Sequence, residues 1–457
     1  MKALVFERNL ARFAASRLAS SLGSGRGAAV GPLRLLEQDA PLLPSGDWAR
    51  VAPVLAGICG SDLATLDGRT SRYFEDVVSF PFVPGHEVLG TLEALPLPLP
   101  LPLAPPQPDP QPRPRPQPEP EPEPQPLAQG DRVVIEPVLG CLARGIDPPC
   151  APCHDGRTGN CERVAFGHLS PGLQTGYCAD TGGGWSAAGL VAHRSQLHRV
   201  PDAFSDEDAV MVEPVACAAH AVCTAPLDDG ATVAVLGAGT LGLGVVAALG
   251  TLARSGAVAT PGAVMVGARY GHQRTLASQL GATAALPPEQ LGRAVRRRSR
   301  SLALGGPTLG AGPLTGGADL VFDCVGSASS IEQSLAMVRP RGTVVLVGMP
   351  GRVHVDLASL WHREVSLAGA YAYGAEAARS GPPVRTFALA FDVVADHSLG
   401  RLVSATYPID RFEEALVHAG GAGRRGAVKV AFDFRHGGRR AGRAAGAPAR
   451  PRPGGAP

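Results

Sequence analysis

The chain has 457 residues, 45% hydrophobic and 18% charged, which is enough apolar material for a folded protein of more than one domain. Its formal net charge of +2 gives no electrostatic reason to expect a nucleic-acid or membrane partner. The N-terminus lacks an apolar segment followed by a small-residue cleavage site, so we expect a cytoplasmic protein. Nine unevenly placed cysteines then suggest metal binding before disulfides.

A first set of metal-type residues begins at the stretch Cys59-Gly60-Ser61-Asp62. His86 and Glu87 are adjacent further along, and Glu213 follows much later. Cysteine, histidine and carboxylate form the donor mix of a catalytic zinc that keeps one coordination position open. As isolated residues, they would suit a buried thiol and a hydrogen-bonded core histidine equally well.

A proline-rich insert occupies residues 95–128, with proline at nearly every second position. Such a segment cannot hold a helix or a central strand, so we expect an extended excursion on the surface. It could bind a proline-recognising partner, but a tolerated loop expansion is the simpler interpretation.

A second metal-type group follows at residues 141–161. Its pattern is Cys150-x2-Cys153-x7-Cys161, with Cys141 upstream. Closely spaced thiolates of this kind are typical of a closed, tetrahedral structural zinc, and chance seldom places three cysteines within so few residues.

From residue 231 onward, apolar runs alternate with helical patterns. The predicted strands are 231–236, 263–268, 318–326 and 342–349, and the predicted helices start near 241, cover 272–282 and lie near 331–338. Runs this apolar indicate a parallel sheet covered by helices on both faces. The uncharged stretch 231–253 is interrupted by five glycines, which favours a strand, a turn and a helix over a membrane span.

The motif G-x-G-x-x-G lies between the first of these strands and its helix, at Gly237, Gly239 and Gly242. The glycines permit a tight turn, a close approach of a diphosphate and close packing of helix on strand. Thr240 and Leu241 complete the turn, and the helix N-terminus offers unpaired N–H groups to the anion. We therefore expect a dinucleotide cofactor here.

The end of the second strand bears on the choice of cofactor. NAD-binding sheets usually place an acidic residue there for the ribose 2′-hydroxyl. This chain has Arg269 instead, with Arg274 close behind and no acid. The arginines could bind a 2′-phosphate, so the sequence favours NADP(H) over NAD(H).

Two further stretches are basic and rich in glycine. Residues 293–317 are predicted to be a solvated helix end and a loop, and residues 434–457 a disordered tail.

Taken together, these features resemble the zinc-containing medium-chain dehydrogenases, the family of alcohol, sorbitol, threonine and glucose dehydrogenases. The matching segments occur in the family's order: GICGSD (57–62), PGHEVLG (84–90), GDRVVIEP (130–137), CAPCHDGRTGNC (150–161), VEP (212–214) and VLGAGTLG (235–242). The resemblance implies an α/β protein with a GroES-like, mainly β catalytic domain at 1–215, a doubly wound Rossmann domain at 216–370, and a return to the catalytic domain at 371–433.

The resemblance assigns Cys59, His86 and Glu87 to the catalytic zinc region. Glu213 matches the glutamate that polyol and glucose dehydrogenases place near the metal, and which of the two glutamates coordinates directly stays open. Ser61 falls at the proton-relay hydroxyl of the family.

Two more positions carry a role by resemblance. Asp62 falls where an acid orients the zinc-bound histidine. At the structural zinc, the family's first cysteine position is Asp147 in this chain, so either Asp147 or Cys141 is the fourth ligand.

The expected activity is hydride transfer between a small alcohol, such as a polyol or sugar, and NAD(P), in a homodimer or homotetramer. Zinc would act as a Lewis acid on the substrate oxygen, and Ser61 would carry the proton. The alternatives are a zinc-free quinone or enoyl reductase on the same scaffold, or a zinc-stabilised binding protein.

Overall fold

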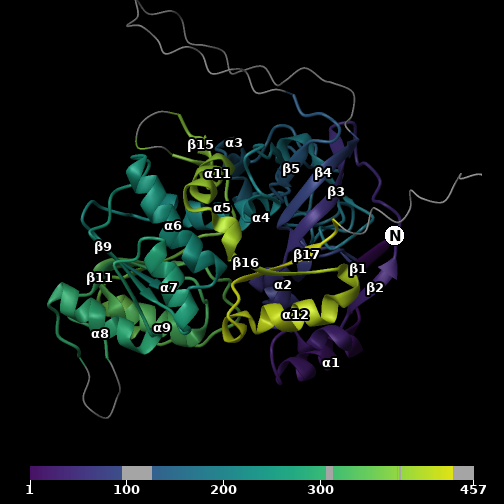
Figure 1. Cartoon of the computed structure of the whole chain (residues 1–457). Coiled ribbons are helices and arrows are strands. Elements are labelled where there is room, and N and C mark those ends of the chain that lie inside the picture. The colour runs from purple at the N-terminus through teal and green to yellow at the C-terminus, as the bar shows by residue number, and fades with distance from the viewer. Residues whose placement is uncertain (95–125, 305–311, 378, 380–381, 436–457) are drawn as a thin grey trace, which may run out of the picture.

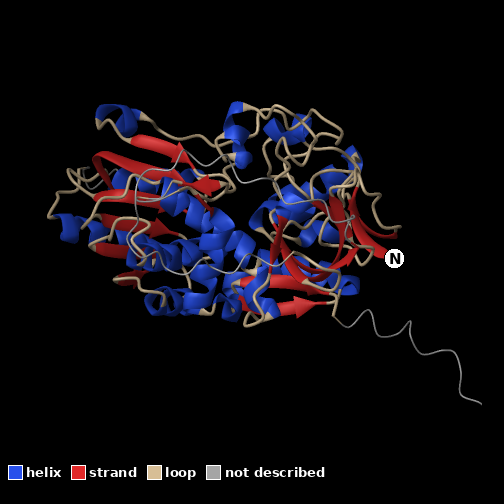
Figure 2. Ribbon diagram, turned by 90° about the horizontal axis from the view of Figure 1, so that it is seen from above, coloured by secondary structure: helices blue, strands red, loops and turns tan. Residues whose placement is uncertain are grey.

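The computed structural model describes residues 1–94, 126–304, 312–377, 379 and 382–435. Two sheets lie side by side with helices between them (Figures 1 and 2). Most of the predicted proline-rich insert and nearly all of the predicted tail lie outside the described residues.

The six-stranded sheet is entirely parallel and has the order β10-β9-β8-β11-β12-β13. This is the order of a doubly wound dinucleotide-binding sheet, in which the strand order reverses between β8 and β11. Its strands are β8 (Thr232–Leu236), β9 (Ala263–Gly267), β10 (Ala284–Leu286), β11 (Ala318–Asp323), β12 (Val338–Leu346) and β13 (Ser366–Gly369). The helices that connect them are α6 (Thr240–Arg254), α7 (Gly271–Gln279), α8 (Pro288–Ser299), α9 (Ala328–Met337) and α10 (Ala358–His362).

The seven-stranded sheet is built from both ends of the chain. Its order is β16-β17-β3-β4-β5-β7, with β6 paired to β3. The strands are β3 (Trp48–Gly57), β4 (Val88–Ala94), β5 (Arg132–Ile135), β6 (Leu190–His193), β7 (Leu197–Arg199), β16 (Val403–Tyr407) and β17 (Lys429–Asp433). Because β17 pairs antiparallel with β3, the end of the described chain lies beside residues 55–57.

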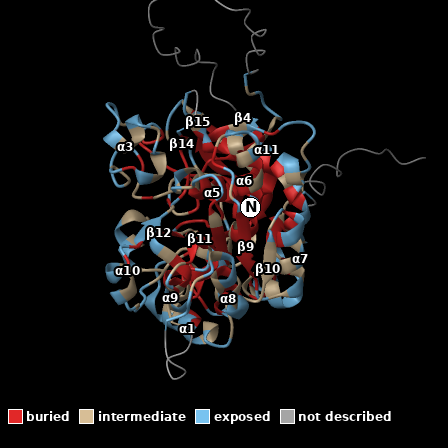
Figure 3. Ribbon diagram, turned by 90° about the vertical axis from the view of Figure 1, so that its left-hand side faces the viewer, coloured by how far each residue is buried: buried red, intermediate tan, exposed pale blue. Residues whose placement is uncertain are grey.

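One apolar core joins the two sheets. It contains α5 (Val212–Thr224), α6 and α11 (Thr386–His397), together with side chains from β3, β4 and β8. In Figure 3 the strands β9 and β11 and the helices α5 and α6 form a continuous buried region. The two sheets are therefore held by helix packing, which fixes where their functional loops meet.

The remaining helices and strands are short. They are β1 (Lys2–Phe6), α1 (Leu10–Ser20), β2 (Leu33–Glu37), α2 (Gly60–Leu66), α3 (Ala151–His154), α4 (Asp206–Val210), β14 (Ala375–Glu376), β15 (Val384–Arg385) and α12 (Phe412–Gly420). No helix in the described part of the chain is long and apolar enough to cross a membrane.

The predicted strand and helix alternation is present, with differences at the element ends. Strand β11 stops at Asp323 because its carboxylate accepts the N–H groups of Val325 and Gly326, which turns the chain. Strand β12 starts at Val338, four residues before the prediction, because a register shift against β11 accommodates Pro340. Neither side-chain hydrogen bonds nor strand register can be read from an apolar pattern.

The burial of His193 predicts a pH-dependent stability. His193 ends β6 against Trp48, and its Nδ1 accepts the N–H of Ser195. Burial lowers the pKa of His193 from 6.5 to about 4, so protonation favours the unfolded chain. The contribution is present above pH 6.5 and is lost as the pH falls toward 4. Between about pH 7 and pH 4, the free energy of unfolding of wild type should fall by up to about 3 kcal/mol more than that of His193→Asn. Urea unfolding at a series of pH values measures this difference. Equal pH slopes would contradict this.

Candidate metal centres and cofactor turn

Cys59 lies in the short connection between β3 and α2. It is the N-cap residue of α2, and the carboxylate of Asp62 accepts its backbone N–H at 2.9 Å. This capping contact fixes the turn that carries the Cys59 thiol. Ser61 lies in the first turn of the same helix, and its hydroxyl has no hydrogen-bond partner among the described residues.

His86 and Glu87 precede β4 on a tightly packed turn. Gly85 has a φ of 97°, and a β-carbon there would lie 2.3 Å from the Trp185 ring, so only glycine fits. A ligand atom from each of Cys59, His86 and Glu87 lies within 4.8 Å of the other two. The structure thus brings three residues from two segments into one group.

This donor set suits zinc. One thiol, one imidazole and one carboxylate match a catalytic zinc that leaves a position for substrate. His86 Nδ1 lies 3.5 Å from Asp62 Oδ1, which leaves Nε2 as the nitrogen available to a metal. Burial opposes a charged His86, but Asp62 and Cys59 outweigh it and hold the pKa of His86 above its usual range.

Tyr177 also contacts Asp62, although no motif in the sequence indicated this residue. Its hydroxyl donates to Asp62 Oδ1 at 3.2 Å, the same oxygen that faces His86. The Tyr177 ring packs against Phe82 and lies 6.0 Å from the His86 ring. The Asp62 carboxylate therefore caps α2, faces His86 and accepts a hydrogen bond from the Tyr177 hydroxyl.

Glu87 has a second partner that sequence reasoning missed. Lys429 Nζ lies 2.5 Å from both carboxylate oxygens, and the exposed fractions of the two side chains are 3% and 1%. Burial lowers the pKa of Lys429, but the charges of Glu87 and Cys59 outweigh it and raise that pKa. The chain contains lysine only here and at position 2, so a lone lysine in an arginine-rich sequence was the available signal.

Glu213 lies at the start of α5, outside the group of three. Its carboxylate accepts the hydroxyl of Tyr373 at 3.1 Å, and the Cys217 thiol lies 3.8 Å from the same oxygen. Burial, together with the charge of Glu87, raises the pKa of Glu213 to about 7. It remains close enough to His86 and Glu87 for their charges to affect its titration.

The four cysteines at 141–161 form a compact second group. The sulfur of Cys141 lies 3.5 Å from that of Cys150 and 3.7 Å from that of Cys161. A tetrahedral zinc with metal–sulfur bonds of about 2.3 Å would have sulfur–sulfur edges of about 3.8 Å. Cys153 completes the group, whereas Asp147 is exposed and lies outside it.

Arg144 organises the loops around these cysteines. Its side chain is completely buried, and it donates to the carbonyls of Leu139, Phe166, Leu169, Ser170 and Gly172. The structure gives Arg144 no ion pair with a carboxylate among the described residues. Four metal-bound thiolates would carry a net negative charge, so a buried guanidinium beside them is electrostatically complementary.

The glycine-rich turn has the stereochemistry that a dinucleotide requires. Gly237 has a φ of 93°, and a β-carbon on Gly242 would lie 1.8 Å from the carbonyl oxygen of Gly237. A β-carbon on Gly239 would meet nothing within 4 Å, so this side of the turn is open to a ligand. Thr240 and Leu241 form the first turn of α6, whose N–H groups point toward that space.

The two arginines after β9 differ in their hydrogen-bond partners. Arg269 is exposed and has no acidic partner in the described part of the chain. Arg274 Nη1 donates to the carbonyls of Ala268 and Arg269, so this guanidinium holds the strand end in place. Arg269 is therefore the freer of the two cations.

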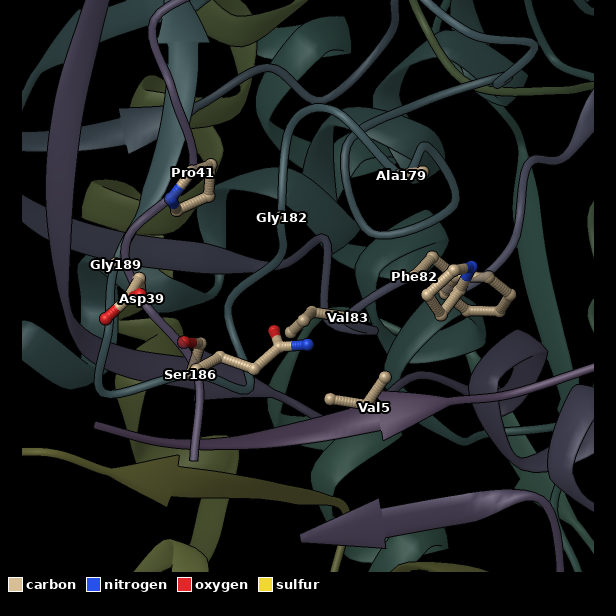
Figure 4. Close-up of a pocket in the computed structure, with 11 residues that line it drawn as sticks. Val5, Asp39, Pro41, Phe82, Val83, Ala179, Gly182, Ser186 and Gly189 are labelled. Atoms are coloured by element: carbon tan, nitrogen blue, oxygen red, sulfur yellow. The ribbon is translucent and has the colours of Figure 1, made fainter. Parts of the chain in front are cut away.

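A surface cavity lies apart from both metal-type groups. It has a volume of about 360 Å³ and lies beside β1, where Val5, Phe82, Val83 and Ser186 line it (Figure 4). None of its lining residues belongs to the predicted site. The cavity is therefore lined neither by the metal-type residues nor by the glycine-rich turn.

Comparison with known proteins agrees with these features. Residues 248–382 match the family profile described as zinc-binding dehydrogenase. The chain is 28% identical over 330 residues to a sorbitol dehydrogenase of Arabidopsis thaliana, covering 71% of this chain and 73% of that protein. It is 27% identical over 320 residues to D-xylulose reductase A of Aspergillus oryzae, covering 70% and 73%. In these comparisons the chain is similar to zinc-binding dehydrogenases that act on polyols and sugars.

Solved structures confirm the fold. A zinc-binding dehydrogenase of Sinorhizobium meliloti, determined with NADP, has a TM-score of 0.59 at 23% identity and covers 88% of this chain and 95% of that one. Galactitol-1-phosphate dehydrogenase of Escherichia coli has a TM-score of 0.63 at 19% identity, covering 95% and 100%. The predicted combination of a Rossmann sheet and a GroES-like domain is confirmed.

The buried Arg144 predicts how the cysteine lobe depends on its surroundings. Arg144→Met leaves several buried carbonyls without a donor, so the free energy of unfolding of the protein should fall by at least about 3 kcal/mol. The four-cysteine site should also release metal to a chelator faster than in wild type. Both can be followed by urea unfolding and a colorimetric zinc chelator.

A matched control lies in the same lobe. Arg163 makes only one hydrogen bond to a carbonyl, that of Pro148 at 3.0 Å. Arg163→Met should stay close to wild type in both measurements. Equal behaviour of the two variants would refute a special role for Arg144.

Proposed function

We propose that this chain is a zinc-dependent, NADP-linked dehydrogenase of a small polyol or sugar alcohol. The observation that carries the proposal is the approach of Cys59, His86 and Glu87 to within 4.8 Å of one another. Zinc, when bound there, supplies Lewis acidity toward the substrate oxygen. A zinc-free reductase has no use for such a set of ligands.

The side chains around the group have distinct tasks in this proposal. Asp62 Oδ1 lies 3.5 Å from His86 Nδ1, and its charge favours the ring orientation in which Nε2 is free to bind the metal. Ser61, two residues after Cys59, offers a hydroxyl with no partner in the described chain. It relays the proton that leaves the alcohol, because it accepts that proton while it releases its own toward solvent. The glycine-rich turn holds the cofactor diphosphate.

Glu87 is the preferred carboxylate ligand, and Glu213 is the alternative. Both carboxylates have other partners, Lys429 at Glu87 and the Tyr373 hydroxyl at Glu213. Glu87 is preferred because it alone belongs to the compact group with Cys59 and His86. At the second site, Cys141 is preferred to Asp147 as the fourth ligand, because its sulfur lies among the other three.

The cofactor and substrate are proposed from the chain and its relatives together. Arg269 stands where an NAD enzyme carries an acid, and one structural relative was determined with NADP. The relatives include a sorbitol dehydrogenase, a D-xylulose reductase and an L-idonate 5-dehydrogenase of Vitis vinifera. Their names share an open-chain polyhydroxylated compound, which sets the substrate class proposed here.

Domain organisation and assembly complete the proposal. The domains are 1–215 with 371–433, and 216–370, since the first set of residues contains the seven-stranded sheet and the second the six-stranded sheet. A homo-oligomer is supported by β13, an edge strand whose four residues are all exposed, and by the exposed Trp361 nearby. An unpaired edge strand of this kind can pair with a second copy.

Zinc content tests the two metal sites separately. Elemental analysis of wild type should give about two zinc ions per chain, and Cys59→Ala and Cys153→Ala should each retain about one. Cys59→Ala should also lose more than ~10²-fold in NADP-linked polyol oxidation. If Cys59→Ala keeps the wild-type metal content, the zinc mechanism is wrong and the zinc-free reductase replaces it.

The choice of carboxylate ligand can be tested on the same assay. Glu87→Gln should weaken zinc binding at the catalytic site by at least about 10-fold in chelator competition, whereas Glu213→Gln should change it less. Glutamine keeps the size of each side chain, but Glu87→Gln also leaves the buried Lys429 without its counter-charge. The double variant Glu87→Gln/Lys429→Met removes both charges and separates loss of a ligand from loss of the ion pair. A larger effect of Glu213→Gln would make Glu213 the ligand.

A further inference from the structure

The segment that follows α12, called the closing segment below, contacts the chain just after β9 of the nucleotide-binding sheet. After α12, residues Ala422–Arg425 form a short 3-10 turn, and Gly423 in this turn lies against Tyr270, the residue before α7. A β-carbon on Gly423 would lie 2.3 Å from Tyr270 Cε2, so the contact depends on glycine. In Figure 1 the yellow segment after α12 extends toward α7.

This turn carries two neighbouring positive charges. Arg424 and Arg425 are both exposed, and a β-carbon on Gly421 would lie 3.3 Å from Arg424 Nη2 and 3.9 Å from Arg425 Nε. The two guanidinium groups therefore gather at one place, and neither forms an ion pair with a described acidic residue. Like charges held this close favour the binding of an anion.

The facing side of the contact is also cationic and lacks partners. Arg269 has no acidic partner among the residues that the structure describes. The ring of His272 stacks on Tyr270, and its buried Nε2 has no hydrogen-bond partner. Tyr270 provides no side-chain cap, so the first N–H groups of α7 are also available. Doubly wound sheets bind the adenosine ribose of a dinucleotide at this strand end.

We propose that Arg424 and Arg425 bind the 2′-phosphate of NADP together with Arg269, so that the closing segment helps to select the cofactor. The inference rests on the NADP preference proposed above and adds the residues that produce it. NAD carries a neutral hydroxyl at this position and would gain little from the cluster. Guanidinium groups suit a phosphate because they can donate two parallel hydrogen bonds.

The test is direct titration of the protein with NADPH and with NADH, without substrate. Replacing both arginines, as Arg424→Ser/Arg425→Ser, should weaken NADPH binding at least ~10-fold and leave NADH binding within about 2-fold. The matched control is Arg297→Ser/Arg298→Ser, which removes the same charge from two exposed neighbours in the last turn of α8. That turn leads away from the strand ends that bind a cofactor, so the control should match wild type for both nucleotides.

A second variant tests position rather than charge. Gly423→Ala keeps both arginines but forces the turn away from Tyr270, so it should also weaken NADPH binding selectively. If both variants leave the NADPH-to-NADH affinity ratio unchanged while Arg269→Ser lowers it, the inference is wrong and the NADP preference stands. If wild type binds NADH as tightly as NADPH, the cofactor preference and this inference fail together.

Discussion

A buried ion pair between Lys429 and Glu87 ties the last strand of the chain to the candidate catalytic site. The two residues are 342 positions apart, yet Nζ lies 2.5 Å from both carboxylate oxygens. A buried carboxylate that loses its cation costs several kcal/mol, so the segment that carries His86 and Glu87 depends on β17 being in place. The antiparallel pairing of β17 with β3 supplies that placement. The return of the chain to its first sheet is thus part of how the site is built.

Asp62 and helix α5 also hold parts of the candidate site in place. The Asp62 carboxylate caps α2, lies 3.5 Å from His86 Nδ1 and accepts the Tyr177 hydroxyl. The arrangement of Cys59 and His86 therefore depends on a correctly formed α2. Helix α5 begins with Glu213 near the metal-type residues and packs against α6, which starts at the glycine-rich turn. Because both helices belong to one apolar core, the metal-type group and the cofactor turn are held by the same packing.

Much of the fold was predictable because it depends on local rules. Uninterrupted apolar runs alternating with helical patterns indicated the parallel sheet, and the structure contains it in the order expected of a doubly wound fold. Element ends were less predictable. Asp323 ends β11 through side-chain hydrogen bonds, and a register shift lets β12 begin before Pro340. Both depend on contacts that no periodicity records.

The sequence by itself determined the cofactor turn, since Gly237 and Gly242 are required by backbone conformation and steric contact within one short segment. Only the tertiary structure decided which distant residues meet: Lys429 with Glu87, Cys141 with the other three cysteines, and the Gly423 turn with Tyr270. The physical reason is the range of the constraint. A turn is fixed by neighbours a few bonds away, whereas these contacts depend on sheet register and helix packing, which are set only when the whole chain has folded.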